Sequence, residues 1–412
     1  MLTSKTCIGV RDLFVAIAVV TGLLLPIASA EPLVIKRQGR TCNDDPFCFN
    51  RLHPAVPMRA QASSGQLLVL ETRNSSDFEL DPARQWDDPR RSDAPGSTIH
   101  PLTGPLHIDG ARAGDSLRVE VIAVEPGAYG ATVITETGLI SDVITSPYFV
   151  SWALGEAYAS SDSLPGVRIP KAAFPGILTT LPGAAQLNAI LERERRARDE
   201  GRVVSMPSPV NALPAELCGP EGSSPDECLR TIPPREHGGN MDSRYLRAGS
   251  TVYLPCYIDG CGLAVGDAHY AQGDGELSGT AIEMDATVLL RAEIVPGMTL
   301  PRGPHYEGPA SLLAIPSGKF YATTGLSVAD PADGESGPRS DDLTRAARNA
   351  LLAMIEHMVA EYGLTREQAY IVASVAVDLR ISQLVNSPNL GVTAILPTDI
   401  FLPQPMRGVP DR

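Results

Sequence analysis

The chain has 412 residues, of which 43% are hydrophobic and 20% are charged, and its formal net charge at pH 7 is −14. This length allows a large hydrophobic core in roughly one to three domains. An acidic protein is repelled at long range by nucleic acid and by anionic membrane surfaces, so we expect neither as a partner. The charge therefore supports solubility but does not identify a function.

The N-terminus has the pattern of a secretory signal. Lys5 and Arg11 precede an apolar stretch from Leu13 to Pro26, and the small residues Ala28, Ser29 and Ala30 follow. This order predicts a signal peptide over residues 1–30 with cleavage after Ala30. A membrane anchor is the alternative, but the apolar stretch is shorter than the twenty or so residues that a spanning helix requires. We expect a secreted or periplasmic protein that does not enter the membrane after cleavage.

Six cysteines follow the signal, in three close pairs: Cys42 with Cys48, Cys218 with Cys228, and Cys256 with Cys261. An even number of cysteines in an exported chain predicts disulfides. Other pairings are possible, because sequence does not decide connectivity, but we favour the three local bonds. Zinc binding is the competing interpretation, although no pair has CxxC spacing. Local bonds would fix loops more than they would hold the whole fold.

The first half of the expected mature chain has the pattern of strands. Residues 31–60 are polar and contain several prolines, so we predict an N-terminal arm tied by the first cysteine pair. From Gln66 onward, apolar and β-branched runs bounded by Gly, Pro or Asp predict strands. The clearest are Leu67 to Glu71, Leu117 to Val124, Val252 to Leu254 and Ala286 to Ile294. We expect a β-rich part that extends to about residue 335.

Helices are predicted in two regions, residues 185–201 and 341–377. The first runs from Ala184 to a stop at Gly201 and has apolar residues on one side only. A Pro- and Ser-rich loop follows it, so we interpret residues 185–230 as an insertion. The second region contains a helix that Gly363 ends, and then a helix that a capping box of Thr365 and Gln368 begins. A strand from Gly391 to Pro397 follows.

The densest group of potentially catalytic side chains lies between Gly266 and Glu283: Asp267, His269, Gln272, Asp274, Glu276 and Glu283. In an extended segment alternate side chains share a face, so Asp267 and His269 would point the same way and could bind one metal ion. The carboxylates after them offer a general base that is not itself a ligand. A calcium-binding turn, or a merely solvated one, is the alternative that these residues leave open.

A second group lies between Pro233 and Asp242, which reads PPREHGGNMD. Asn240 and Asp242 would share a face in an extended segment, and they could complete a metal site made of oxygen and nitrogen ligands. The alternative is a tight Gly-Gly-Asn turn in which Asp242 only accepts hydrogen bonds from the backbone.

These two segments resemble the acetamidase/formamidase family, whose members carry PPR-x-[HN]-GGN-[ML]-D followed by GD-x-H-x-x-QGDGE-x-x-GT-x-x-E. Shorter islands share the resemblance: His100 to Pro105, Phe174 to Gly176, Thr323 to Gly325 and Asp378 to Phe401. It implies a catalytic unit over residues 61–412. The fold implied is mainly β, of jelly-roll or β-sandwich type, with an added α+β part over residues 336–412, and the assembly implied is a homo-oligomer. The activity implied is hydrolysis of small linear amides to ammonia and a carboxylic acid.

With this resemblance we predict a divalent metal ion held by Asp242, Asp267 and His269, with Asn240 as a further ligand. Zinc is favoured for ligands that include histidine, and calcium is the alternative if oxygen ligands dominate. Such an ion would activate water for attack on the amide.

We predict that Glu276 is the general base and that Glu283 positions it or the substrate. His100, Gln272 and His237 are the predicted substrate-binding residues. No GxSxG motif surrounds Ser278, and paired cysteines leave no free thiol, so serine and cysteine nucleophiles are disfavoured. The alternative function is a non-catalytic exported protein that binds a metal or ligand on the same scaffold.

Overall fold

The computed structural model describes residues 30–78, 80, 96–135, 138–300, 303–314, 317–327, 342–384 and 390–402. The predicted signal peptide lies outside the described residues except for Ala30. Among the described residues, no helix has both the length and the apolar character needed to cross a membrane.

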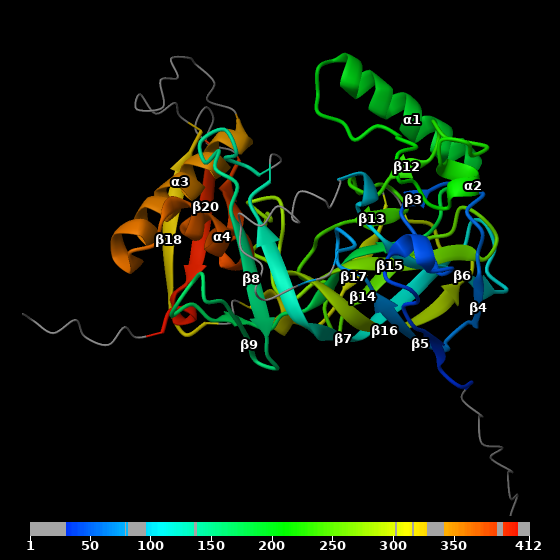
Figure 1. Cartoon of the computed structure of the whole chain (residues 1–412), viewed down its shortest axis with the longest axis horizontal. Coiled ribbons are helices and arrows are strands. Elements are labelled where there is room, and N and C mark those ends of the chain that lie inside the picture. The colour runs from blue at the N-terminus through cyan, green and yellow to red at the C-terminus, as the bar shows by residue number, and fades with distance from the viewer. Residues whose placement is uncertain are drawn as a thin grey trace, which may run out of the picture.

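Fifteen of the described strands form one hydrogen-bonded network, the β body of the molecule (Figure 1). Its main path runs through β10 (Ile169–Pro170), β9 (Tyr158–Ser160), β8 (Phe149–Leu154), β7 (Ser116–Val133), β16 (Glu283–Val295), β15 (Cys261–His269), β11 (Phe174–Thr179) and β13 (Gly238–Asn240). The remaining strands of the network are β1 (Leu33–Ile35), β2 (Cys48–Phe49), β4 (Ala60–Ser63), β5 (Leu67–Thr72), β6 (Leu102–Asp109), β14 (Thr251–Pro255) and β17 (His305–Glu307). The strands predicted from sequence at β5, β7, β14 and β16 are confirmed, and β7 and β16 extend beyond their predicted ends.

Strand β15 brings polar residues into the interior. It pairs antiparallel with β6, β11 and β16, and all of its side chains are buried. The sequence of a strand that is buried on both faces is a continuous apolar run rather than an alternation of apolar and polar residues. Because the apolar run ends in Asp267 and His269, these two polar side chains are buried together with it.

The segment predicted as an N-terminal arm is attached to the β body by short strands. β1 pairs in parallel with β5, β2 pairs with β6, and β4 pairs in parallel with β6. The remaining short strand, β3 (Arg51–Leu52), forms a separate two-stranded sheet with β12 (Leu229–Arg230).

The predicted insertion packs on this N-terminal segment. It contains α1 (Ala184–Asp199), which matches the predicted helix, and a short α2 (Ala215–Cys218). Leu187, Ile190 and Leu191 of α1 join Phe49 and Leu52 in a core separate from the main one. Short 3-10 helices connect other elements: η1 (Cys42–Asp44), η3 (Gly96–Thr98), η4 (Ala310–Leu313) and η6 (Thr398–Ile400).

The C-terminal part is an α+β unit at the opposite end of the molecule from α1 (Figure 1). Its sheet has the order β18 (Phe320–Leu326), β20 (Gly391–Pro397), β19 (Asp378–Gln383), and the long helix α3 (Leu343–Tyr362) packs on it. The predicted stop at Gly363 is confirmed by its left-handed φ of 68°. The capping box of Thr365 and Gln368 is also confirmed, and it begins α4 (Arg366–Ala376).

The three predicted local disulfides are present, with Cα–Cα distances of 5.1 Å for Cys42–Cys48, 5.6 Å for Cys218–Cys228 and 4.6 Å for Cys256–Cys261. Zinc binding by these cysteines is therefore excluded. The predicted mainly β class with an α+β part is confirmed as well.

Candidate active site

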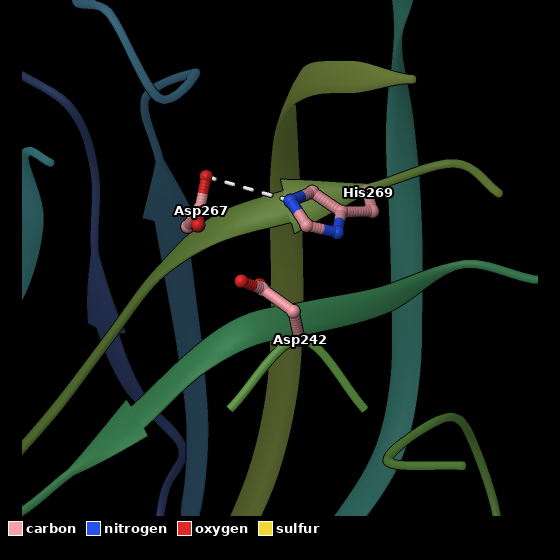
Figure 2. Close-up of side chains that lie close together, drawn as sticks. All are labelled: Asp242, Asp267 and His269. Atoms are coloured by element: carbon pink, nitrogen blue, oxygen red, sulfur yellow. Dashed lines mark ion pairs between the residues drawn. The ribbon is translucent and has the colours of Figure 1, made fainter. Parts of the chain in front are cut away.

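The side chains of Asp267 and His269 meet at the end of β15, although the backbone of Asp267 is not extended. His269 Nε2 is 3.5 Å from Asp267 Oδ1, and Figure 2 shows the two side chains directed at each other. Both residues are almost completely buried, at 0% and 2% exposure for His269 and Asp267. Two potential ligand atoms this close together inside the protein make the pair a candidate for metal binding.

Asp242 reaches the same point from the segment Pro233 to Asp242, next to β13. The backbone N–H groups of Met241 and Asp242 both donate to the carbonyl oxygen of Gly176 on β11, at 3.1 and 3.3 Å. One ligand atom each from Asp242, Asp267 and His269 lies within 4.8 Å of the others (Figure 2). The two segments singled out in the sequence therefore form one site.

Gly176 is a site residue that sequence reasoning missed. A Cβ atom at this position would lie 2.6 Å from Asp242 Oδ1 and 2.8 Å from the carbonyl oxygen of Asp267. The close approach of β11 to the Asp242 carboxylate and to the backbone of Asp267 thus depends on glycine. The only sequence signal was its place in the shared Phe174-Pro175-Gly176 island.

Glu276 and Glu283 form a second group with His269. Carboxylate oxygens of both lie within 4.8 Å of a His269 nitrogen and of each other, and Glu283 Oε2 is 3.3 Å from His269 Nε2. The second oxygen of Glu283 accepts a hydrogen bond from the N–H of Ala281 at 2.8 Å, which fixes the carboxylate. His269 is shared by this group and by the group that contains Asp242 and Asp267.

The backbone at the site is strained. Asp242, Asp267 and Glu276 have left-handed φ angles of 43°, 54° and 46°, and they are three of the six non-glycine residues with positive φ in the described part of the chain. Such conformations are disfavoured by the Cβ atom and persist where surrounding structure imposes them, often at functional sites.

Four side-chain atoms of the cluster are buried and lack a hydrogen-bond partner among the described residues: Asp242 Oδ1, Asp267 Oδ1, His269 Nε2 and Glu283 Oε2. Three of them, Asp267 Oδ1, Glu283 Oε2 and His269 Nε2, are in ion-pair contact with one another. Three carboxylate oxygens and one imidazole nitrogen are a ligand set that suits a divalent cation. The residues present therefore fit the predicted metal. Asn240 Oδ1 is also buried without a hydrogen-bond partner among the described residues.

The electrostatics of the cluster favour a bound cation. Burial raises the pKa of Asp242 to about 7, and the charge of Asp267 adds to the effect. Burial and the charge of Glu283 raise the pKa of Asp267 to about 6. Burial opposes ionisation of Glu283, but His269 outweighs it and lowers the pKa of Glu283 to about 2. Carboxylates that repel one another in a buried site are stabilised by any positive charge placed between them.

His269 responds to the same field. Burial alone would lower its pKa, but Glu283 and Asp267 together hold the pKa well above 6.5. In the metal-free protein a proton on His269 therefore provides positive charge between the carboxylates. A metal ion would take over this role, because a ligating imidazole nitrogen must be unprotonated.

Gln272, a predicted substrate residue, has both ends of its amide group bound to protein. Its Nε2 donates to the carbonyl oxygen of Asp242 at 2.7 Å, so its Oε1 faces His269 Nδ1 at 2.9 Å. Because this oxygen can only accept, Nδ1 carries a proton and Nε2 is the nitrogen available to a metal. The contacts give Gln272 a positioning role for His269 and Asp242.

His100 borders the cluster. Its Nε2 is 3.7 Å from Asp267 Oδ2, and burial lowers its pKa to about 4, so the ring is neutral at pH 7. The Thr231 hydroxyl accepts from the His100 backbone N–H at 2.6 Å and is 3.1 Å from Nδ1. The hydroxyl proton is then free for Nδ1, which leaves the ring proton on Nε2, the nitrogen that faces the site.

Two residues from the predicted set lie apart from the cluster. His237 is fully buried, and its Nδ1 is 2.8 Å from the Thr179 hydroxyl. Thr179 lies three residues along β11 from Gly176, which corresponds to roughly 10 Å in an extended strand. Burial and Arg235 lower the pKa of His237 to about 3, so it is neutral. Asp274 accepts a hydrogen bond from the Tyr245 hydroxyl and does not belong to either ligand group.

Comparison with known proteins identifies the family of this chain. A family model described as the Acetamidase/Formamidase family matches residues 35–402. The formamidase of Methylophilus methylotrophus is 30% identical over 372 residues, which cover 85% of this chain and 89% of that protein. The acetamidase of Mycolicibacterium smegmatis is 30% identical over 356 residues, which cover 78% and 84%.

Solved structures agree with this assignment. The γ-lactamase from Delftia acidovorans superimposes with a TM-score of 0.82 at 29% identity, covering 90% of this chain and 93% of that chain. The acetamidase from Bacillus halodurans, 22% identical, shares the fold with a TM-score of 0.50. The chain belongs to the acetamidase/formamidase family.

Proposed function

We propose that the protein is a metal-dependent amidohydrolase that cleaves the carbon–nitrogen bond of small amides. The observation that carries the proposal is the group of four buried ligand atoms on Asp242, Asp267, His269 and Glu283 that have no hydrogen-bond partner among the described residues, with Glu276 beside them. The relatives are named for formamide, acetamide and a γ-lactam, which are all small amides. The acyl group is therefore proposed to be small, and the amide to be either linear or cyclic.

Asp242, Asp267 and His269 would hold the ion, with Glu283 next to it. Zinc suits a mixed set of histidine and carboxylates, and calcium would require more oxygen ligands. When bound, a divalent cation supplies Lewis acidity and lowers the pKa of water in its coordination sphere. The residues around it must then move protons and orient the amide.

Glu276 is proposed to move the protons. Burial and the charge of Asp242 raise its pKa well above 4.5, so this carboxyl group holds a proton more readily than an exposed glutamate. A group with a raised pKa can take a proton from the attacking water and return it to the leaving nitrogen. The nitrogen needs this proton because an amide anion is a very poor leaving group.

His100 is proposed to bind the substrate. Its neutral ring, with the proton on Nε2, can donate a hydrogen bond to the amide carbonyl oxygen without adding a charge that would repel a cation. Donors that face a developing negative charge on oxygen are a large contribution to catalysis. Glu283, fixed by the N–H of Ala281, would keep His269 in place.

The test combines metal analysis with product analysis. We expect one divalent ion per chain in the purified protein and its loss in Asp267→Ala and His269→Ala. The wild type is expected to release ammonia from formamide or acetamide, or to open a γ-lactam ring, which releases no ammonia. Stoichiometric metal that survives both substitutions would place the ion elsewhere. Bound metal with no turnover of any of these amides would favour a non-catalytic binding protein.

We also propose that the protein is exported. The N-terminal pattern of a signal peptide and three disulfides in the folded chain support this, because such bonds persist in oxidising compartments. Protein recovered from the periplasm or medium should begin at Glu31. Recovery of the full-length chain from the cytoplasm only would contradict export.

A further inference from the structure

Four side chains outside the ligand groups connect the two halves of the site. We propose that Arg244, Tyr245, Asp274 and Asp378 form a brace that fixes the metal-binding segment relative to the loop of Glu276. The brace deepens the proposed function, on which it rests, because that function gives Asp242 and Glu276 their roles.

The shortest connection joins Tyr245 to Asp274. Tyr245 follows Asp242 by three residues and Asp274 precedes Glu276 by two, and the Tyr245 hydroxyl donates a hydrogen bond to Asp274 Oδ2. This single hydrogen bond therefore links the segment of a proposed ligand with the loop of the proposed base. Both side chains are partly buried, so water competes for it less than at an exposed site.

A second connection passes through the C-terminal unit. Asp378, the first residue of β19, forms a buried ion pair with Arg244. The same Asp378 Oδ1 accepts from the backbone N–H of Asp274 at 3.2 Å, and the N–H of Leu379 donates to the carbonyl oxygen of Asp274 at 3.1 Å. One carboxylate of the α+β unit thus contacts both halves of the site.

The loop of Glu276 is held on α4 as well. The N–H of Gly273 donates to the carbonyl oxygen of Ser374 at 2.8 Å, and the N–H of Ser278 donates to the Ser374 hydroxyl at 3.0 Å. A Cβ atom at Gly273 would lie 2.2 Å from the carbonyl oxygen of Val377, so the loop and the end of α4 are in direct contact. Because α4 fixes the loop of Glu276, the hydrogen bond of the Tyr245 hydroxyl determines the position of the Asp242 segment relative to this loop.

The four brace residues are positioning residues, because they act through Asp242 and Glu276. Misplacement of a reacting group reduces turnover, while binding of the substrate to groups that have not moved is retained. Removing one member should therefore reduce kcat more than it raises KM. A variant that had lost only overall stability would melt at a lower temperature but would not show a larger effect on kcat than on KM.

Tyr245→Phe is the decisive variant, because it removes only the hydroxyl. We expect kcat to fall about tenfold, as for residues that orient the groups of a metal site, with KM and metal content unchanged. Tyr253→Phe is the matched control, since the Tyr253 hydroxyl donates to Glu307 Oε1 at 2.7 Å in an exposed hydrogen bond between β14 and β17, neither of which carries a residue of the ligand groups. A Tyr245→Phe enzyme with kcat within about twofold of both wild type and control would overturn the brace.

Two substitutions at Asp274 separate the hydrogen bond from the charge. Asp274→Asn keeps an oxygen that can accept from Tyr245, so its kcat should stay close to that of wild type. Asp274→Leu removes the acceptor and should match Tyr245→Phe, and the double variant should be no worse than either one, because both remove the same contact. If Asp274→Asn lowers kcat as much as Asp274→Leu does, the contact acts through the charge of Asp274. The proposal that the brace acts by positioning would then be wrong.

Hydrogen–deuterium exchange tests the brace without a measurement of enzymatic activity. Amides of residues 272–280 should exchange faster in Tyr245→Phe than in wild type, and Tyr253→Phe should leave them unchanged. If the wild type hydrolyses no amide, the proposed function fails and exchange alone decides the brace. Unchanged exchange in Tyr245→Phe would then overturn it.

Discussion

The carboxyl group of Glu276 illustrates how one residue acquires its chemistry from its surroundings. An exposed glutamate is ionised at neutral pH, but burial and the charge of Asp242 raise the pKa of Glu276 well above 4.5. In sequence the residue is one of three carboxylates in a glycine-bearing loop, and nothing local distinguishes it from Asp274. Proximity to His269 and Glu283, which the fold provides, makes Glu276 the candidate acid and base.

The substitution Glu276→Gln tests this role. The amide keeps the size of the side chain but cannot accept and return a proton, so we expect activity to fall by about 10²- to 10⁴-fold. Metal content should remain at the wild-type level, because the ligands Asp242, Asp267 and His269 are unchanged. Activity of each variant against the best amide substrate and its metal content are the measurements. Glu307→Gln, an exposed glutamate away from the site, is the control, and a Glu276→Gln enzyme as active as this control would remove Glu276 from the mechanism.

The raised pKa values predict how the metal-free protein responds to pH. Asp242 and Asp267 have ordinary pKa values of 3.8 but about 7 and about 6 in the folded chain. A carboxyl group whose pKa rises on folding binds its proton more tightly in the folded state, so its contribution to stability is lost as pH rises from about 4 to 7. We expect chelator-treated protein to melt at a lower temperature at pH 8 than at pH 5.

Asp242→Asn provides the comparison for this pH effect, because asparagine cannot ionise and resembles the protonated aspartic acid. The difference in melting temperature between pH 5 and pH 8 should be smaller in this variant than in chelator-treated wild type. The same difference in both proteins would show that other groups cause it.

At the scale of elements, the site depends on the contact of three strands. β11 lies between β13 and β15, so the segments that carry Asp242 and Asp267 meet across it. The carbonyl oxygen of Gly176 accepts hydrogen bonds from the N–H groups of Met241 and Asp242, and the absence of a Cβ at Gly176 leaves room for the Asp242 carboxylate and the His269 ring. A glycine in the middle of a strand is otherwise unfavourable, so its presence here indicates that the close approach of the neighbouring chain requires it.

We expect Gly176→Ala to abolish metal binding or to weaken it severely. The added methyl group would lie 2.6 Å from Asp242 Oδ1 and 3.0 Å from His269 Cε1, closer than van der Waals contact allows. Gly391→Ala in β20 is a matched control, because its nearest neighbour would be at an ordinary 3.5 Å. Titration of the metal-free proteins with zinc would compare them. Equal zinc affinity in the two variants would show that β11 can move away without cost.

At the scale of the whole molecule, the disulfides have different relations to the site. Cys42–Cys48 fixes a loop of the N-terminal segment, whereas Cys256–Cys261 closes the loop that leads directly into β15. The two bonds join residues 6 and 5 positions apart, so their entropic effects on the unfolded chain are similar. Their effects on function should differ.

Two double variants test this difference. Cys42→Ala/Cys48→Ala and Cys256→Ala/Cys261→Ala should each lower the free energy of unfolding by about 2 kcal/mol in denaturant titrations. Only the second should also weaken metal binding, because Cys261 begins the strand that ends in Asp267 and His269. Equal metal affinity in both would show that the strand is positioned by its sheet neighbours alone.

Local sequence determined the parts of this fold that are stabilised by interactions between residues close in sequence. The capping box of Thr365 and Gln368, the helix stop at Gly363 and the apolar side of α1 were predicted from neighbouring residues, because caps and helix faces depend on contacts within a few positions. The spacing of Asp267 and His269 also predicted that the two side chains act at one point, and they are in contact. The two segments that hold the proposed ligands were also identifiable from residue types and the family resemblance.

Tertiary structure alone decided which of those residues act together. Whether Gln272 contacts substrate or His269, and whether His237 lies in the site or beside Thr179, depends on contacts between residues far apart in sequence. The same is true of Gly176, and of Asp378, which reaches the site from the last strands of the chain. Burial sets the pKa values of the cluster, and burial is a property of the packed molecule rather than of any segment. The sequence by itself therefore determined the ligand types and local elements, and only the packed sheet decided their distances and charges.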